Sequence, residues 1–327
     1  MNKNHLLSLL KIGLAIGILY WLWQSDRINF AVILKTLHPY YGPILLVCIL
    51  SSLVAYVARL HLILSAKELA HSYWHTWKLS MMGLFFNFTL PGGTSGDVVK
   101  IYYLCKDHSD QKASVVGLVV LDRVVGLFGM MSMAFIGLMI RPSELFNQGD
   151  LQVIFIILGA GLLTLTALLS FFVYCSKTKE LEHPLLDKLL KYKILSKIYE
   201  VAVYLADLRL FIKALFLTFI TQGFAVLVLY VSALAIGYQD LDLVSFFIVA
   251  PLGFIVTAIP IAPAGVGVGQ VAFLALFKIY TGVESDLGPT VVTVYQVLLF
   301  MAGLTGLYYY LRPGPGTSLK AQEYQSL

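Results

Sequence analysis

The residues of this sequence best suited to chemistry are two charged pairs in otherwise apolar surroundings. Asp122 and Arg123 lie inside the apolar stretch 113–140. A guanidinium offers two parallel donors to a phosphate, so we expect Arg123 to bind a phosphate while Asp122 orients it or pairs with Lys100. The alternative is a purely structural role, in which other helices satisfy the two charges separately. Asp97 and Lys100 form the second pair, and their i, i+3 spacing places them on one helix face.

Small and hydroxyl-bearing residues form the turn before Asp97. They are Gly92, Gly93, Thr94, Ser95 and Gly96. Backbone amides at the start of a helix attract anions, so this turn is a candidate binding site to which Thr94 and Ser95 add hydroxyl donors. The alternative is that Ser95 or Asp97 caps the helix instead.

A second proline- and glycine-rich segment, 260–270, contributes Gly265, Gly267 and Gln270 as candidate binding residues. Its glycines do not make a dinucleotide-binding fingerprint, because the third glycine falls one place early and no soluble strand precedes it. The sequence also lacks a P-loop, so we expect no nucleotide cofactor.

Histidines and cysteines do not suggest a metal site in this sequence. His71 and His75 are four residues apart, but no carboxylate lies directly beside them, so we expect no metal there. The three cysteines, Cys48, Cys105 and Cys175, lie far apart without the paired spacing of a disulfide framework or a zinc site. We interpret them as small apolar residues.

The composition requires these residues to be positioned by membrane helices. Hydrophobic residues make up 59% of the 327 residues, charged residues only 13%, and the mean hydropathy is +0.83. Such a chain cannot cover its surface with polar groups, which excludes a soluble enzyme, a secreted domain and a disordered protein. We therefore expect an all-α polytopic membrane protein that forms one transmembrane domain over 1–311, with no nucleic-acid partner.

Six stretches are long and apolar enough to cross a hydrocarbon core of roughly 30 Å. They are residues 6–24, 40–64, 113–140, 151–175, 211–236 and 289–311. The alternative for the first is a cleaved signal peptide, but no small-residue cleavage site follows Trp23. Arg59, close to the end of the second stretch, is expected at the inner membrane interface.

Two further regions, 79–104 and 243–280, each contain a break rich in proline and glycine. Proline removes a backbone hydrogen bond and disfavours helical geometry in the preceding residue, so neither region can form one straight span. Because lipid cannot satisfy the freed backbone groups, the breaks should be buried in protein or line a watery cavity. With the charge distribution described below, we expect two re-entrant hairpins, and eight to ten hydrophobic segments in all. The alternative is that 243–280 crosses the membrane twice.

The distribution of positive charge predicts the orientation. Residues 177–213 carry eight Lys and Arg, whereas 237–242 and 281–288 carry none, so the first should be cytoplasmic and the others external. Both termini are then cytoplasmic, and the two hairpins enter from opposite faces with their tips facing each other. The cytoplasmic stretch includes an amphipathic segment, 184–210, and the tail 312–327 is expected to be disordered.

Three segments together resemble the transmembrane region of the lysylphosphatidylglycerol synthase family, often described as flippase-like. They are Leu90-Pro91-Gly92-Gly93-Thr94-Ser95-Gly96-Asp97-Val98-Val99-Lys100, Asp122-Arg123-Val124-Val125-Gly126-Leu127, and Pro260 to Gln270. Lys100 replaces the usual Arg, Asp122 stands where Glu is common, and Gly269-Gln270 replace an Arg-Glu pair. We expect no soluble aminoacyl-transferase domain within these residues.

The resemblance implies a protein of the bacterial or archaeal inner membrane that moves a phospholipid or a polyprenyl-linked lipid between leaflets, passively or coupled to an ion. One alternative is a membrane-embedded lipid-modifying enzyme with Asp97 or Asp122 as base. Another is a scaffold for a separate partner synthase or transferase. A homo-oligomer is compatible with each of these.

Overall fold

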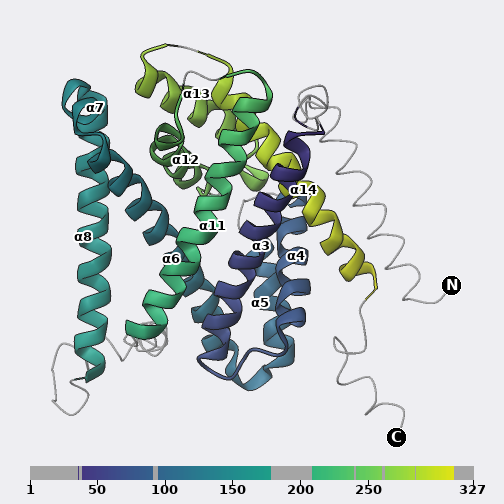
Figure 1. The fold of residues 1–327 in the computed structure, drawn as a ribbon. Coiled ribbons are helices and arrows are strands. Elements are labelled where there is room, and N and C mark those ends of the chain that lie inside the picture. The colour runs from purple at the N-terminus through teal and green to yellow at the C-terminus, as the bar shows by residue number, and fades with distance from the viewer. Residues whose placement is uncertain are drawn as a thin grey trace, which may run out of the picture.

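The computed structural model describes residues 36, 39–90, 95–177, 208–238, 241–259, 262–283 and 285–312. Every regular element in this part of the chain is a helix (Figure 1), which confirms the all-α prediction. Several predictions fall outside these residues: the span 6–24, the positions of Gly92, Gly93 and Thr94, nearly all of the segment 184–210, and the tail after Arg312.

Five long helices match predicted spans. They are α3 (Tyr41–Ser65), α6 (Lys112–Ile140), α8 (Gly149–Lys177), α11 (Leu208–Ala235) and α14 (Leu287–Leu311). Each contains a window apolar enough for a membrane crossing. A sixth candidate of sufficient length, Pro263–Thr281, belongs to the predicted second hairpin. The described helices therefore support a multi-pass membrane protein.

The first hairpin consists of α4 (Tyr73–Thr89) and α5 (Ser95–Asp107). Ser72 caps α4 by accepting a hydrogen bond from the His75 amide, and the helix ends at Leu90, which is extended before Pro91. The two helices run antiparallel and approach closely where a glycine on each meets the other. With 17 residues, α4 is about 25 Å long, shorter than the hydrocarbon core.

The second hairpin consists of α12 (Leu243–Thr257), the short 3-10 helix η2 (Pro263–Gly265) and α13 (Val268–Thr281). Asp242 caps α12 through the amide of Ser245. Between the helices the backbone turns at positive φ at Ala264, Gly265 and Gly267, a conformation that costs glycine little. With 15 residues, α12 is about 22 Å long and does not span the core by itself.

The two hairpins start from opposite ends of the bundle. α3 and α11 are antiparallel, because Ser52 contacts Thr221 while Arg59, further along α3, contacts Thr218. The first hairpin follows the end of α3, and the second follows the end of α11, which lies at the other end (Figure 1). Val266, at the tip of the second hairpin, packs against Phe88, close to the end of α4.

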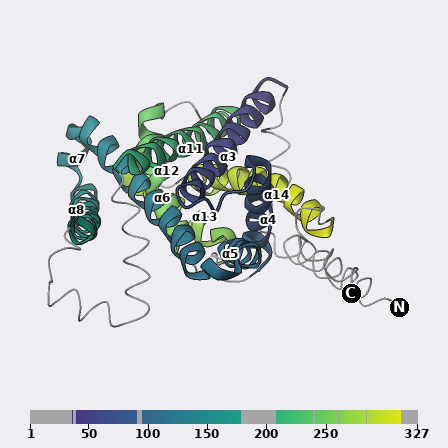
Figure 2. The ribbon, with the colours of Figure 1, turned by 90° about the horizontal axis from the view of Figure 1, so that it is seen from below.

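One long helix, α8, lies at the side of the bundle. Seen from below, it stands apart from the other long helices (Figure 2). Large apolar side chains on it are exposed, among them Ile156, Ile157 and Leu163. Exposed apolar residues over the length of a helix suit contact with lipid rather than with water.

A single added methyl group tests the packing of the first hairpin. A Cβ on Gly96 would lie 2.0 Å from the carbonyl oxygen of Gly83. We expect Gly96→Ala to lower the stability by about 1 to 3 kcal/mol, seen as a lower melting temperature in detergent micelles.

The matched control is Gly223→Ala, because a Cβ at this helical glycine of α11 meets no atom within 4 Å. Alanine is the better helix former by about 1 kcal/mol, so this variant should melt at or above the wild-type temperature. A Gly96→Ala protein as stable as the Gly223→Ala protein would contradict the close helix contact.

Candidate functional site

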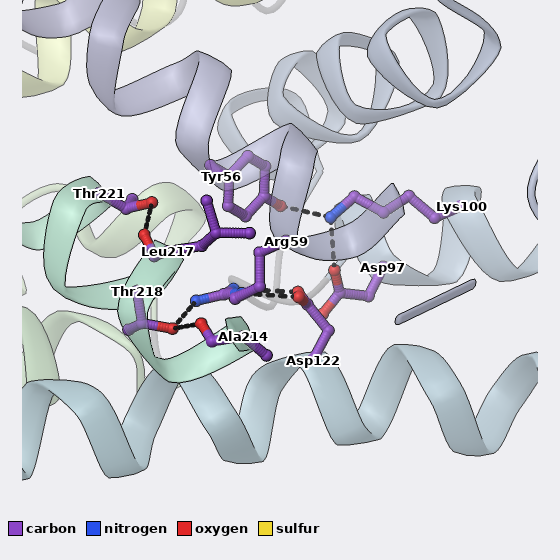
Figure 3. A network of polar contacts seen from close by, with 9 residues as sticks. All are labelled: Tyr56, Arg59, Asp97, Lys100, Asp122, Ala214, Leu217, Thr218 and Thr221. Carbon is purple, nitrogen blue, oxygen red and sulfur yellow. Dashed lines mark hydrogen bonds and ion pairs between the residues drawn. The ribbon is translucent and has the colours of Figure 1, made fainter. Parts of the chain in front are cut away.

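A buried ion pair joins three helices at the centre of the site. Arg59 of α3 donates from Nε to Oδ1 of Asp122 of α6 at 2.7 Å, and from an Nη nitrogen to Oδ2 at 3.1 Å. Its other Nη nitrogen donates to the hydroxyl oxygen of Thr218 of α11 at 3.1 Å. Both charged side chains are only 6% exposed. Bidentate pairing of this kind is the strong form of a charge-assisted hydrogen bond (Figure 3).

This pair bears on the predictions for Arg59 and Asp122. Arg59, which was expected at the inner membrane interface, is buried among the helices of the bundle. Asp122 bonds neither Arg123 nor Lys100, because its two carboxylate oxygens accept from Arg59. The alternative prediction, that another helix supplies the partner of Asp122, agrees with this contact, because Arg59 belongs to α3.

Two glycines of α6 make room for the pair. A Cβ on Gly126 would lie 3.1 Å from an Nη nitrogen of Arg59, and one on Gly129 would lie 2.4 Å from a methyl carbon of Thr218. Asp122, Gly126 and Gly129 follow the i, i+4, i+7 spacing of one helix face. The same face of α6 thus supplies the charge and the space into which α3 and α11 fit.

A second cluster lies beside the first and is centred on Asp97 of α5. One carboxylate oxygen of Asp97 accepts from the ammonium of Lys100 at 3.1 Å, and the other accepts from Nε of Arg123. The ammonium also donates to the hydroxyl of Tyr56, one helical turn before Arg59 (Figure 3). Its nitrogen lies 4.9 Å from the centre of the Tyr56 ring, within the range of a cation–π contact.

Burial differs sharply between the three cations. The side chain of Lys100 is 1% exposed and that of Arg59 is 6% exposed, whereas that of Arg123 is 37% exposed. Because two carboxylates face three cations, the site carries one excess positive charge at neutral pH. That excess is most accessible at Arg123.

At the start of α5, two groups of the predicted anion site have hydrogen-bond partners within the protein. The hydroxyl of Ser95 donates to the carbonyl oxygens of Phe86 and Leu90, and the Gly96 amide donates to Oδ1 of Asn87 at 2.8 Å. Asn87, at the end of α4, thus occupies a backbone amide that sequence reasoning assigned to a ligand. Among the described residues, the side chains of Ser95 and Asp97 bond other groups than the first amides of α5.

Gly265, Gly267 and Gln270 lie away from the charged cluster, at the tip of the second hairpin. The side-chain oxygen Oε1 of Gln270 accepts from the backbone amide of Gly267 at 2.7 Å, which caps the start of α13. Its amide nitrogen donates to Gln296 of α14 at 2.9 Å and to Thr293 at 3.1 Å. These contacts stabilise the tip, so they give the second segment a structural role.

The structure therefore brings together Asp97, Lys100, Asp122 and Arg123, and adds Tyr56 and Arg59. Arg59 carried the same signal as Asp122, a charge within a predicted span. Charges within a membrane helix cost roughly 2.5 to 3.5 kcal/mol each on insertion scales, so an arginine there calls for a carboxylate partner.

Removing one charge of the buried pair tests its role in stability. Asp122→Asn leaves Arg59 buried without a counter-charge, and such a loss typically costs about 3 to 5 kcal/mol. We expect a large fall in melting temperature, and recovery of much of it in the double variant Arg59→Met, Asp122→Leu, which removes both charges.

Arg123→Ala provides the comparison, because its partly exposed pair with Asp97 should contribute less. Equal destabilisation by Asp122→Asn and Arg123→Ala would contradict the ranking of the two pairs by burial.

Comparison with known proteins supplies the family. The family model described as "Lysylphosphatidylglycerol synthase TM region" matches residues 8–306, nearly the whole chain. No curated protein and no solved structure matches. A match of this extent includes all six residues of the charged site, and it associates the chain with lipid metabolism or translocation in a membrane. The chain belongs to the lysylphosphatidylglycerol synthase transmembrane-region family.

Proposed function

We propose that this protein moves lipids with a phosphate-bearing headgroup between the two leaflets of the membrane. The observation that carries the proposal is the position of Arg123, a partly exposed cation at the edge of a buried charge cluster. Arg59 and Lys100 are enclosed by their partners, so they stabilise the cluster while Arg123 meets the headgroup.

Arg123 lies on an apolar outer surface formed by α5 and α6. On α6, the exposed residues Val116 and Val120 precede it at the i, i+4, i+7 spacing of one helix face. On α5, Val98 and Tyr102 are also exposed. This surface suits a lipid whose acyl chains contact the valines while its phosphate reaches the guanidinium.

Exchange of partners at Arg123 provides the binding step. Within the described residues, its one recorded bond uses Nε, which leaves both Nη nitrogens available to a phosphate. A phosphate that competes with Asp97 for Arg123 does not leave Asp97 unpaired, because Lys100 still donates to that carboxylate. The excess positive charge offsets the negative charge of the headgroup, which lowers the cost of its passage through a low-dielectric region.

The contacts of the two carboxylates favour transport over the enzyme hypothesis. A general base needs a carboxylate oxygen within reach of its substrate and free to accept a proton. Both oxygens of Asp122 accept from Arg59, and each oxygen of Asp97 accepts from a cation. Neither is poised as a base.

We place the protein in the inner membrane of a bacterial or archaeal cell, with both termini cytoplasmic. The lysine-rich stretch 177–213 supports this orientation, because cytoplasmic loops carry an excess of positive charge.

Liposomes that contain the purified protein test the proposal. Fluorescent phosphatidylglycerol and a fluorescent polyprenyl phosphate, placed in both leaflets, become accessible to an external quencher as they cross. Wild-type protein should accelerate the crossing of at least one of them over protein-free liposomes. Arg123→Ala should slow it about tenfold or more, because a charge-assisted contact contributes roughly 1.5 to 3 kcal/mol.

Arg141→Ala is the matched control. Its side chain is 34% exposed and pairs with Glu144 and Asp242, but it lies at the other end of α6 from the charged cluster. This variant should transport at the wild-type rate. Equal rates for wild type and Arg123→Ala, or no acceleration by wild type with either lipid, would refute the proposed role.

A further inference from the structure

Three residues that can bind a metal converge at the open end of the first hairpin. His71 lies just before α4, His75 lies in its first turn, and Asp107 is the last residue of α5. Nε2 of His75 is 3.3 Å from Oδ2 of Asp107, and Nε2 of His71 is 3.8 Å from the same oxygen. The three ligand atoms all lie within 4.8 Å of one another. The sequence places Asp107 far from the histidines, and the hairpin brings it to them.

One of these atoms lacks a hydrogen bond. Nε2 of His75 is buried and has no hydrogen-bond partner among the described residues, although it lies close to the Asp107 carboxylate. Buried polar atoms without a partner are rare, because leaving one unsatisfied costs about 1 to 3 kcal/mol. An ion bound between the imidazole and the carboxylate would satisfy it.

The separations of the two imidazole nitrogens from the Asp107 oxygen are close to those in a tetrahedral site. Zinc binds imidazole nitrogen and carboxylate oxygen at roughly 2.0 to 2.2 Å, so two ligand atoms of a tetrahedral site are about 3.3 to 3.6 Å apart. The distances of 3.3 and 3.8 Å to the Asp107 oxygen lie at or near this value. Two imidazoles and one carboxylate are a ligand set that zinc commonly uses, with water in the fourth position.

A ring contact orients the imidazole of His71. The ring of His108 stacks on that of His71 at 5.1 Å between centroids. The His71 side chain is 37% exposed, which leaves a route for the ion and for a bound water.

We infer that His71, His75 and Asp107 form a binding site for a divalent transition metal of the zinc class. The site joins the segment before α4 to the end of α5, so a bound ion clamps the open end of the hairpin that carries Asp97 and Lys100. Binding to the folded protein alone raises its stability in proportion to the logarithm of the ion concentration.

The test uses the full-length protein in detergent, purified with a tag that contains no histidine. Titrated with Co²⁺, the wild type should develop the intense visible bands of tetrahedral cobalt at one ion per chain, and Zn²⁺ should abolish them. Zn²⁺ should also raise the melting temperature. His75→Ala and Asp107→Asn should each weaken Zn²⁺ binding tenfold or more, measured by competition with a chromogenic chelator.

His61→Ala is the matched control. This histidine lies near the same end of the bundle, and its Nδ1 contacts Thr76 rather than the cluster. It should bind Zn²⁺ like the wild type. The inference is overturned if wild-type protein shows no tetrahedral cobalt bands. It is also overturned if His75→Ala and Asp107→Asn bind Zn²⁺ as tightly as His61→Ala. The cobalt titration of the wild-type protein tests the inference even where a variant fails to fold.

Discussion

The buried pair of Arg59 and Asp122 is the constraint on which the rest of the structure depends. Two charges taken out of water lose several kcal/mol of hydration each, so they persist inside a bundle only with full mutual satisfaction. Arg59 reaches that state by using all three nitrogens on Asp122 and Thr218. This requirement fixes the register of α3, α6 and α11 against one another.

Two close contacts at glycines serve the same need to enclose charge. Glycine at Gly126 admits the guanidinium, and glycine at Gly83 admits the aliphatic chain of Lys100, whose Cε would lie 2.7 Å from an added Cβ. Lys100 is thereby packed under α4 while its ammonium reaches Asp97 and Tyr56. Arg59, Asp122 and Lys100 form the enclosed part of the cluster and hold the helices together. Arg123 lies at the edge, where it can exchange Asp97 for another partner.

The chemical character of the site could be predicted from the sequence, but its pairing could not. Asp97, Lys100, Asp122 and Arg123 stand out because charges are costly in apolar stretches. Which cation meets which carboxylate depends on helix packing: Arg59 and Asp122 are 63 residues apart. Arg59 lies near the end of a predicted span, so the sequence alone favours a position at the membrane interface over a partner on another helix.

The breaks of both hairpins were predictable because proline and glycine act locally. The first break falls between the end of α4 at Thr89 and the start of α5 at Ser95, and the second falls between Thr257 and Val268. Their polar tips were harder to interpret. Asn87 and Gln270 occupy backbone amides that resemble ligand sites in sequence. A side chain that caps a helix and one that binds a ligand carry the same groups, and only the fold distinguishes them.

Photocrosslinking tests the central claim most directly, that a lipid headgroup meets the charged cluster at Arg123. A phospholipid with a photoreactive headgroup would be incorporated with the protein into lipid nanodiscs, and the crosslinked peptides would be mapped by mass spectrometry. The account predicts crosslinks concentrated on the surface of α5 and α6 that contains Val98, Val120 and Arg123. Crosslinks spread evenly over lipid-exposed helices, with α8 labelled as strongly as α6, would contradict it.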